Sequence, residues 1–318
     1  MPQPTVSQVH PINPIQTQLS ITGRNMKYAA EKIAPFVKCD QKTGTYFIYS
    51  VDYWLRKPPS GLHAYGTPYQ QVGYGVTNGT FNCQEFGFQK FLSDAERKAS
   101  QTPEDLQLKD TQYVTNMMQL DIESAVASKL WTTSVWGTDK TGGTDFTMWD
   151  DYADSDPIHD IKAGRMAIKR RVGIFPNTLM LGVSAFEQLI EHPLLLDKFK
   201  YTMKGILTED LLADVFKVEE VISADASYIS SAEGQSTIVG ADIWGPSALL
   251  LCRNNPTLGV ANGAYTFIWD EVGNFPWAVQ TYRDEGYRGN QTRCFTHRDT
   301  EVVSSIHGYF MSGVVNAL

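Results

Sequence analysis

The chain has 318 residues, of which 42% are hydrophobic and 19% are charged, so it is long enough to bury the core of one large or two modest domains. Its formal net charge of -8 and its isoelectric point near 5.3 argue against a general nucleic-acid binder, because contacts to phosphates need clustered Lys and Arg. We find no signal-peptide core and no apolar run of about 18 residues, so we expect no membrane association and a cytosolic site of synthesis.

The first part of the chain is predicted to be an arm, covering residues 1–39. Up to about residue 35 it is rich in Pro and Gln and poor in large apolar side chains, so it cannot form a core of its own. Its charge is basic, from Arg24, Lys27 and Lys32 against Glu31 alone. We expect these three cations to contact a neighbouring subunit that holds the arm in place.

Residues 40–92 are predicted to form a projecting hairpin. A strand over 34–40, a Gly-containing turn and a second strand over 45–55 lead into a stretch at 56–79 that is crowded with Gly, Pro and Tyr. Structureless connections above about 15 residues are unusual inside a compact domain. The extended pattern resumes over 81–92 as the return leg. We expect the hairpin to bury six apolar side chains against another subunit: Trp54, Leu55, Leu62, Tyr65, Tyr69 and Tyr74.

A long helix is predicted from Pro103 to Trp131, with a length of about 43 Å at about 1.5 Å per residue. Its start has Thr102 as N-cap, Pro103 in the first turn, and two acidic residues facing the positive end of the helix dipole. Its apolar stripe is predicted to contain Leu106, Tyr113, Met117, Leu120 and Trp131, widened by Val114, Met118 and Ile122.

The remainder reads as a helix, an α/β lobe and a β-rich return. Asp156 and Pro157 open a helix that ends before Gly173. Strands and helices alternate over 174–262, where Ser184 and Glu187 form an expected capping box and Thr208 is expected to cap a further helix. The strands of 263–318 are expected to pair with earlier segments beside the long helix.

No local motif indicates catalysis, and we predict no catalytic, cofactor-binding or metal-binding residues. The glycines at 73, 75 and 79 have the wrong last spacing for a nucleotide loop and open no helix. The six histidines lie in unrelated contexts, and the four cysteines, which form no CxxC pair, are expected to be packing residues. An enzyme whose site converges only in three dimensions stays open as an alternative.

The order of arm, long hairpin, spine helix, α/β lobe and β-rich return resembles the major capsid proteins of tailed bacteriophages. The likeness is carried by stretches such as TPEDLQLKDTQYVTNMMQLDIESAVA and PNTLMLGVSAFEQLIEHPLLLDKFKYTMKGILTEDLLADVFKVEEVISA, and it covers nearly the whole chain. It implies an α+β fold of the Hong Kong 97 type. The implied parts are an N-terminal arm (1–39), an extended loop (40–92), a peripheral domain with the spine helix (93–173), an axial domain (174–262) and peripheral return strands (263–318).

The same resemblance implies the function and the partners. The chain would be synthesised in the host cytoplasm and would assemble with itself, through pentamers and hexamers, into the icosahedral shell of a virion. That shell would enclose double-stranded DNA without sequence-specific binding, with scaffold, portal and decoration proteins as further partners. Lys57 lies in the loop where some relatives form a covalent Lys-to-Asn crosslink, but the sequence identifies no partner Asn. An encapsulin-type nanocompartment shell is the alternative within this fold.

Overall fold

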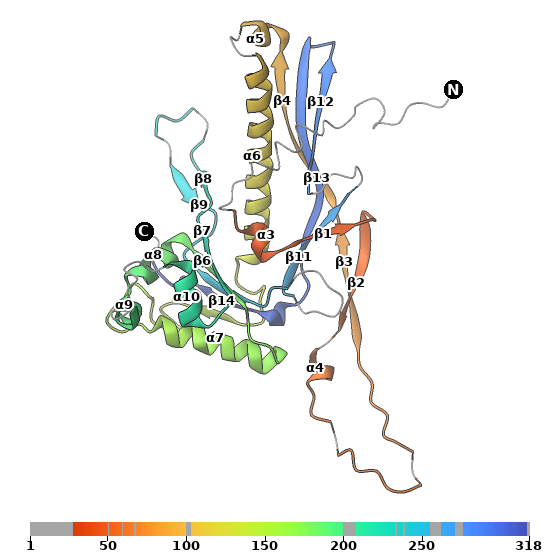
Figure 1. Cartoon of the computed structure of the whole chain (residues 1–318), viewed down its shortest axis with the longest axis vertical. Helices are drawn as coiled ribbons and strands as arrows, with labels where there is room; N and C mark the ends of the chain where they lie inside the picture. The colour runs from red at the N-terminus through yellow and green to blue at the C-terminus, as the bar shows by residue number, and fades with distance from the viewer. Residues whose placement is uncertain are drawn as a thin grey trace.

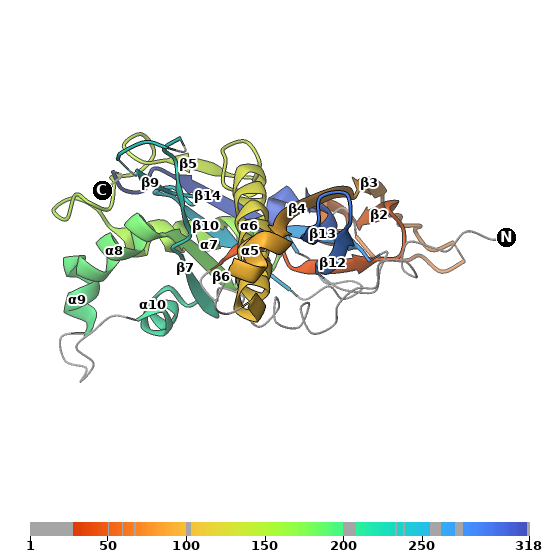
Figure 2. The same ribbon diagram turned by 90° about the horizontal axis from the view of Figure 1, so that it is seen from above.

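The chain folds into an elongated, flattened molecule built around one long helix (Figure 1). A β-sheet lies along one side of this helix, an α/β lobe lies on the other, and a hairpin projects beyond the sheet. The view from above shows the helix between the lobe and the sheet (Figure 2). The computed structural model describes residues 28–49, 51–58, 60–66, 68–99, 103–199, 208–232, 234–237, 239–254, 262–270 and 276–316.

The first sheet is built around one long strand from the C-terminal part of the chain. Its members are β1 (Phe36–Cys39), β4 (Gln84–Ser93), β11 (Ala264–Trp269), β12 (Ala278–Asp284) and β13 (Gly289–Val302). The order is β1-β11-β13-β12, and β4 also pairs with β13. The first part of β13 pairs with both β12 and β4, and its last residues pair with β11. The expected pairing of the C-terminal strands with earlier segments beside the long helix is therefore confirmed.

The long helix α6 spans Pro103–Leu130, close to the predicted bounds, and its 28 residues give a rod of about 42 Å. It follows the short helix α5 (Asp94–Ala99) and packs against β4 and β13. The predicted apolar stripe is rotated relative to the buried face, as shown by Tyr113, which is 55% exposed.

The buried face of α6 is lined by apolar and polar residues together. The apolar members are Val114, Met118, Ile122, Val126 and Leu130, and the polar members are Thr111, Thr115, Gln119 and Glu123. The threonine hydroxyls bond to carbonyl oxygens one turn earlier in the helix, so their burial leaves no unsatisfied donor. The spacing of apolar residues alone cannot locate this face, because polar residues occupy some of its buried positions.

The α/β lobe contains a second sheet, of order β5-β14-β10-β6-β7. Its strands are β5 (Asp139–Thr141), β6 (Thr178–Gly182), β7 (Glu220–Ala224), β10 (Ala248–Leu251) and β14 (Gly308–Ser312). Its helical elements are α7 (Pro157–Val172), α8 (Val183–Glu191), α9 (Pro193–Phe199), α10 (Glu209–Phe216) and η1 (Ser305–His307), and a small hairpin pairs β8 (Ser227–Ile229) with β9 (Gly240–Asp242). This sheet takes β5 and β14 from outside 174–262, and the division into domains stays a prediction.

Two hydrophobic clusters hold these parts together. One lies within the lobe, between its sheet and the helices α7, α8 and α10. The other joins α6 and the first sheet to the lobe, and the Trp131 ring makes edge contacts there with Trp244 and Phe310 at centroid distances of 5.3 and 5.4 Å. The long helix and the lobe therefore share a core.

Helix α7 has the predicted ends. The Asp156 carboxylate accepts a hydrogen bond from the backbone N–H of His159 at 3.0 Å, and Pro157 occupies the first turn. Gly173 closes the helix in the left-handed conformation, with φ of 83°.

The capping box predicted for α8 is wrong. The helix begins at Val183, directly after strand β6, so Ser184 lies inside the first turn and Gly182 occupies the N-cap position without a side chain. A Cβ on Gly182 would lie 2.1 Å from the carbonyl oxygen of Gly245. Only glycine at this position permits such a close approach to the Gly245 carbonyl. Thr208 does stand at the N-cap position of α10, but its side chain makes no capping hydrogen bond.

The projecting hairpin is formed by β2 (Thr43–Tyr49) and β3 (Val76–Asn82), which pair antiparallel. Two details of the prediction are wrong. The end of the expected second strand is the short helix α4 (Val51–Trp54), and the expected return leg divides at Cys83. Cys83 is fully buried and its N–H donates to the carbonyl oxygen of Lys42, which anchors the point where the chain leaves the hairpin and enters β4.

The end of the predicted arm is part of the core of its own chain. Helix α3 (Ala30–Ile33) packs against α6, and β1 forms an edge of the first sheet. Ala29, Ala30, Ile33 and Ala34 are all buried. The segment was predicted to form no core of its own, and from Ala29 onward it joins the core built by the rest of the chain. Arg24 and Lys27 lie outside the described residues.

Candidate assembly surfaces

The loop at the end of the hairpin exposes a continuous series of apolar side chains. The six residues expected to make subunit contacts are all exposed, by 53% or more, and Tyr53 and Val72 add to them. Leu62, Tyr65 and Tyr69 are the extreme cases at 92%, 107% and 80%. Monomeric soluble proteins rarely present large contiguous apolar surfaces, so this loop has the character of an interface.

The ring contacts found among the described loop residues join residues of the loop itself. The rings of Trp54 and Tyr74 lie 5.9 Å apart and link its two sides, and the His63 ring stacks on Tyr69 at 4.3 Å. Leu55 instead lies over Gly173 at the end of α7, where a Cβ would meet its Cδ1 at 3.2 Å. The base of the loop therefore rests on the lobe, while Leu62 and Tyr65 stand clear of it.

The base of the hairpin is fixed to the first sheet. Phe267 of β11 stacks on Phe81 at 4.6 Å and on Tyr46 at 5.4 Å. The Asn82 N–H donates to the Asp299 carboxylate at 2.8 Å. The fixed base determines the direction in which the exposed loop projects (Figure 1).

A buried carboxylate holds the start of the described chain against the long helix. Glu123 of α6 is 1% exposed and accepts hydrogen bonds from the Ala29 and Ala30 N–H groups, at 2.8 and 2.9 Å. The Trp244 indole N–H donates to the same carboxylate at 2.6 Å. Burial raises the pKa of Glu123, and these three hydrogen bonds offset part of that effect.

Sequence reasoning missed Glu123, although a signal for it exists. Thr111, Thr115, Gln119 and Glu123 recur every four residues, which places them on one helix face next to Met118 and Ile122. Lys32, expected to reach another subunit, forms an ion pair with Glu220 of its own chain at 3.5 Å. Its contact to a neighbour stays a prediction.

A basic hollow of about 740 Å³ lies where α4 approaches the C-terminal end of α7. Arg56, Arg170 and Arg171 line it together with four residues that bring apolar surface: Val51, Tyr53, Leu55 and Ile306. The three arginines are exposed. The hollow thus combines positive charge with apolar walls.

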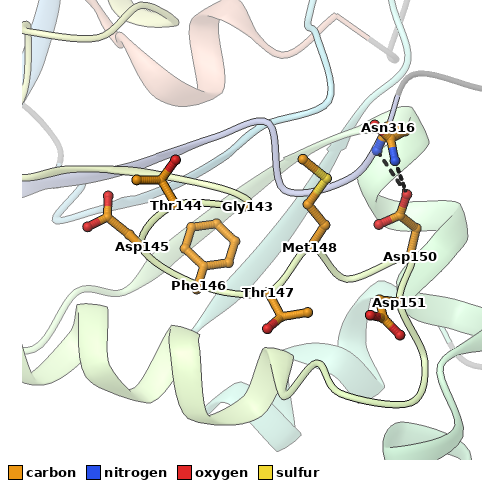
Figure 3. A pocket seen from close by; sticks show the side chains of 9 residues that line it. All are labelled: Gly143, Thr144, Asp145, Phe146, Thr147, Met148, Asp150, Asp151 and Asn316. Carbon is orange, nitrogen blue, oxygen red and sulfur yellow. Dashed lines mark hydrogen bonds between the residues drawn. The ribbon is translucent and has the colours of Figure 1, made fainter.

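An acidic hollow of about 670 Å³ lies in the lobe, lined by residues 143–148, 150 and 151 and by Asn316 (Figure 3). Asp145 accepts from Lys140 Nζ at 2.8 Å, and this hydrogen bond holds the pKa of the carboxyl below its usual range. Asp150 accepts two hydrogen bonds from Asn316 (Figure 3). Across the described ranges, no three His, Cys, Asp or Glu side chains converge as metal ligands would.

One buried Ser–His pair has the composition of a catalytic dyad but the wrong hydrogen-bond polarity. Ser155 Oγ lies 3.0 Å from His192 Nε2, while His192 Nδ1 accepts from the Leu194 N–H at 3.3 Å. A neutral imidazole that accepts at Nδ1 carries its proton on Nε2 and donates to the serine. Burial lowers the pKa of His192, which favours this neutral form. In this tautomer Nε2 has no free lone pair with which to take the serine proton, as a general base must.

Three of the four thiols, those of Cys83, Cys252 and Cys294, are buried rather than activated, and Cys39 is partly buried. Burial raises the pKa of Cys83 to about 11 and of Cys252 and Cys294 to about 12. A nucleophilic cysteine needs a lowered pKa, so these environments suit packing residues. His297 and His307 are also embedded separately, the first against the Trp269 ring at 5.0 Å and the second with Nδ1 2.7 Å from Ser304 Oγ.

The arrangement of spine helix, two sheets and projecting hairpin is a fold shared with solved phage proteins. A phage-related protein from Bordetella bronchiseptica matches with a TM-score of 0.75 at 19% identity, over 98% of this chain and 100% of that one. The capsid of cyanophage P-SCSP1u matches with a TM-score of 0.57 at 10% identity, over 87% and 85%. The fold is α+β and of the Hong Kong 97 capsid type, as predicted.

Curated relatives give the class of protein. The chain is 26% identical over 246 residues to the major capsid protein of Burkholderia phage BcepMu, covering 75% of this chain and 76% of the relative. It is 23% identical over 250 residues to the major capsid protein of Pseudomonas phage JBD67, covering 77% and 78%. No family model matches the chain. The resemblance to phage major capsid proteins is confirmed, and these relatives are structural proteins by name.

The described helices include none that is long and apolar enough to cross a lipid bilayer.

Proposed function

We propose that this chain is the major capsid protein of a tailed phage and builds an icosahedral head from pentamers and hexamers. The observation that carries the proposal is the loop with its exposed Leu62, Tyr65 and Tyr69 on a rigid hairpin base, in a chain similar to two phage major capsid proteins. An isolated chain gains nothing from such a loop, whereas a neighbouring copy can cover it.

Repetition of one contact accounts for a closed shell. A loop that lies on the next copy makes a head-to-tail contact, and such contacts close into rings when the rotation between copies permits. In this proposal the loop joins subunits within a ring, α6 stiffens each subunit, and the lobe faces the ring axis. The completed shell, in the virion, encloses double-stranded DNA, with scaffold, portal and decoration proteins as further partners.

The test is a loop replacement designed on the β2–β3 register. Tyr49 and Val76 are direct partners, so replacing residues 50–75 by Asn-Gly makes a two-residue turn that leaves both strands intact. If the loop buries 400 Å² of apolar surface, its loss removes about 10 kcal/mol per contact at about 25 cal/mol per Å², before ordering costs. We expect a folded subunit that stays monomeric or forms only isolated rings.

Light scattering after size-exclusion chromatography and negative-stain microscopy measure the particles, and circular dichroism reports folding. A full-length variant with Leu62, Tyr65 and Tyr69 all changed to Ser should also fail to assemble. Its matched control, Leu62→Met with Tyr65→Phe and Tyr69→Phe, keeps the apolar surface and should form shells. Full-sized shells from the loop-replaced chain would contradict the proposal. Shells that contain a cargo enzyme and no DNA would instead identify a nanocompartment.

A further inference from the structure

The basic hollow at the end of α7 holds more positive charge than the described residues neutralise. Among the described residues, no carboxylate forms an ion pair with Arg56, Arg170 or Arg171. Arg170 and Arg171 favour the negative end of the α7 dipole, which explains their presence in its last turn. Arg56 follows α4 and serves no such role, yet it lines the same hollow. Helix capping therefore does not account for the cluster.

The walls of the hollow indicate what kind of anion fits. Val51, Tyr53, Leu55 and Ile306 line it beside the arginines, and Tyr53 and Leu55 are half exposed. A phosphate backbone would satisfy the charges and leave this apolar surface in water. A protein segment with carboxylates next to an aromatic side chain satisfies both.

Such a segment lies at the opposite end of α7. The loop that precedes the helix contains Asp151, Tyr152 and Asp154, all of them exposed. The 16 residues of α7 separate the two ends by about 24 Å, so the loop cannot reach the hollow of its own chain. Helix α7 thus has an acidic segment at its start and a basic hollow at its end, and this charge pattern suits a head-to-tail contact between copies.

We propose that the hollow formed by Arg56, Arg170 and Arg171 receives the Asp151–Asp154 segment of a second copy of this chain. The inference rests on the proposed self-assembly and adds to the loop contact a polar contact within the same ring. Charge pairs of this kind set partner orientation and register. The acidic residues that face the hollow then come from the neighbour, and the excess charge of each copy is neutralised only in the ring.

The test reverses each end of α7 separately in the full chain. We expect Arg170→Glu with Arg171→Glu to lower the yield of rings and shells at least tenfold, and Asp151→Arg with Asp154→Arg to do the same. The variant with all four substitutions restores the complementary pairs and should recover at least half of the wild-type yield. Lys162→Glu with Lys198→Glu reverses two exposed lysines outside the hollow and should assemble like wild type.

The most discriminating experiment mixes the two charge-reversed variants, one with Arg170→Glu and Arg171→Glu and the other with Asp151→Arg and Asp154→Arg. Each protein alone presents like charges at both ends, but alternating copies present complementary pairs at every contact. An alternating ring needs an even number of subunits, so the equimolar mixture should give hexamers and no pentamers in negative-stain images.

Several results would overturn the inference. Normal assembly of the Arg170→Glu, Arg171→Glu chain would do so, as would absence of recovery in the fourfold variant and in the mixture while circular dichroism shows folded protein. Normal assembly with weaker binding of duplex DNA would assign the hollow to nucleic acid instead. A wild-type chain that stays monomeric would overturn the proposed function together with this contact.

Discussion

Replacing Glu123 by Ala should detach the segment that begins at Ala29 and Ala30 from the long helix α6. The substitution removes one carboxylate that accepts three hydrogen bonds in a site that is 1% exposed. A buried donor left without a partner costs about 1 to 3 kcal/mol, and relaxation of the site makes the three losses less than additive. We expect a loss of about 4 kcal/mol in the free energy of unfolding, a large part of the roughly 5 to 15 kcal/mol typical of a folded protein.

Calorimetry and native-state hydrogen exchange measure this effect. The unfolding temperature should fall by about 8 °C, at about 2 °C per kcal/mol for a chain of this size. The Ala29 and Ala30 amides should lose protection even where the global fold survives. Glu187→Ala on α8 is the control, because that side chain is exposed and makes no capping bond. An unfolding temperature within 2 °C of wild type, with both amides still protected, would refute the reasoning.

The same site predicts a pH dependence. Burial raises the pKa of Glu123 above its ordinary value, so the folded chain binds this proton at a higher pH than the unfolded chain does. The proton-linked part of the stability from this site is complete below the unfolded pKa and is lost as the pH rises through the folded pKa, separately from the hydrogen bonds that the carboxylate accepts. Glu123→Gln should remove that dependence, and an unchanged slope of stability against pH would contradict it.

Three further perturbations have defined outcomes. His307 is buried and burial lowers its pKa to about 4 from an ordinary 6.5, so it destabilises the fold as the pH falls through that window. His307→Gln should therefore remove a loss of about 3 kcal/mol in the free energy of unfolding at acid pH, at about 1.4 kcal/mol per pKa unit. Urea titrations at several pH values measure this loss, and a variant with the same dependence of stability on pH as wild type would contradict the prediction. Gly182→Ala should cost about 2 to 3 kcal/mol because its Cβ would lie 2.1 Å from the Gly245 carbonyl oxygen; thermal unfolding like that of wild type would argue against the close approach. Deleting residues 1–26 should leave thermal unfolding unchanged and weaken assembly, whereas deletion through residue 34 should destabilise the subunit by removing buried Ile33; equal particle yields from the shorter deletion and wild type would contradict the role of the arm.

Sequence reasoning succeeded where local chemistry determines structure. The ends of α7 follow from caps and helix breakers that act within one turn, and Gly173 is left-handed as its position predicts. Helix α6 begins at Pro103 as predicted, but its expected N-cap Thr102 lies outside the described residues. The exposed loop was also predictable, because a long segment rich in Gly, Pro and Tyr offers no periodic face for a core. The six loop residues chosen from that composition are exposed in the structure.

Sequence reasoning failed where contacts between segments far apart in the chain determine which residues are buried. The α6 stripe is rotated because polar residues share the buried face, among them Glu123, which binds backbone groups 93 and 94 residues away. The burial of Ala29 and Ile33 against α6 likewise has no local signature. The need for glycine before α8 comes from the carbonyl of Gly245, which lies 63 residues beyond Gly182 in the chain. The basic hollow joins residues more than a hundred positions apart, so the sequence does not show that Arg56 lies beside Arg170 and Arg171.

The long strand β13 gives the loop a mechanically favourable attachment. The hairpin continues through Cys83 into β4, and β4 pairs with β13 over ten consecutive residues. In Figure 1 the hairpin projects roughly along the direction of these strands. Tension applied to the loop therefore pulls β4 lengthwise past β13, and the hydrogen bonds between them lie across the pull and share the load. A pull at right angles would open the bonds one at a time. The chain is thus built to resist stretching in the direction in which its loop reaches outward.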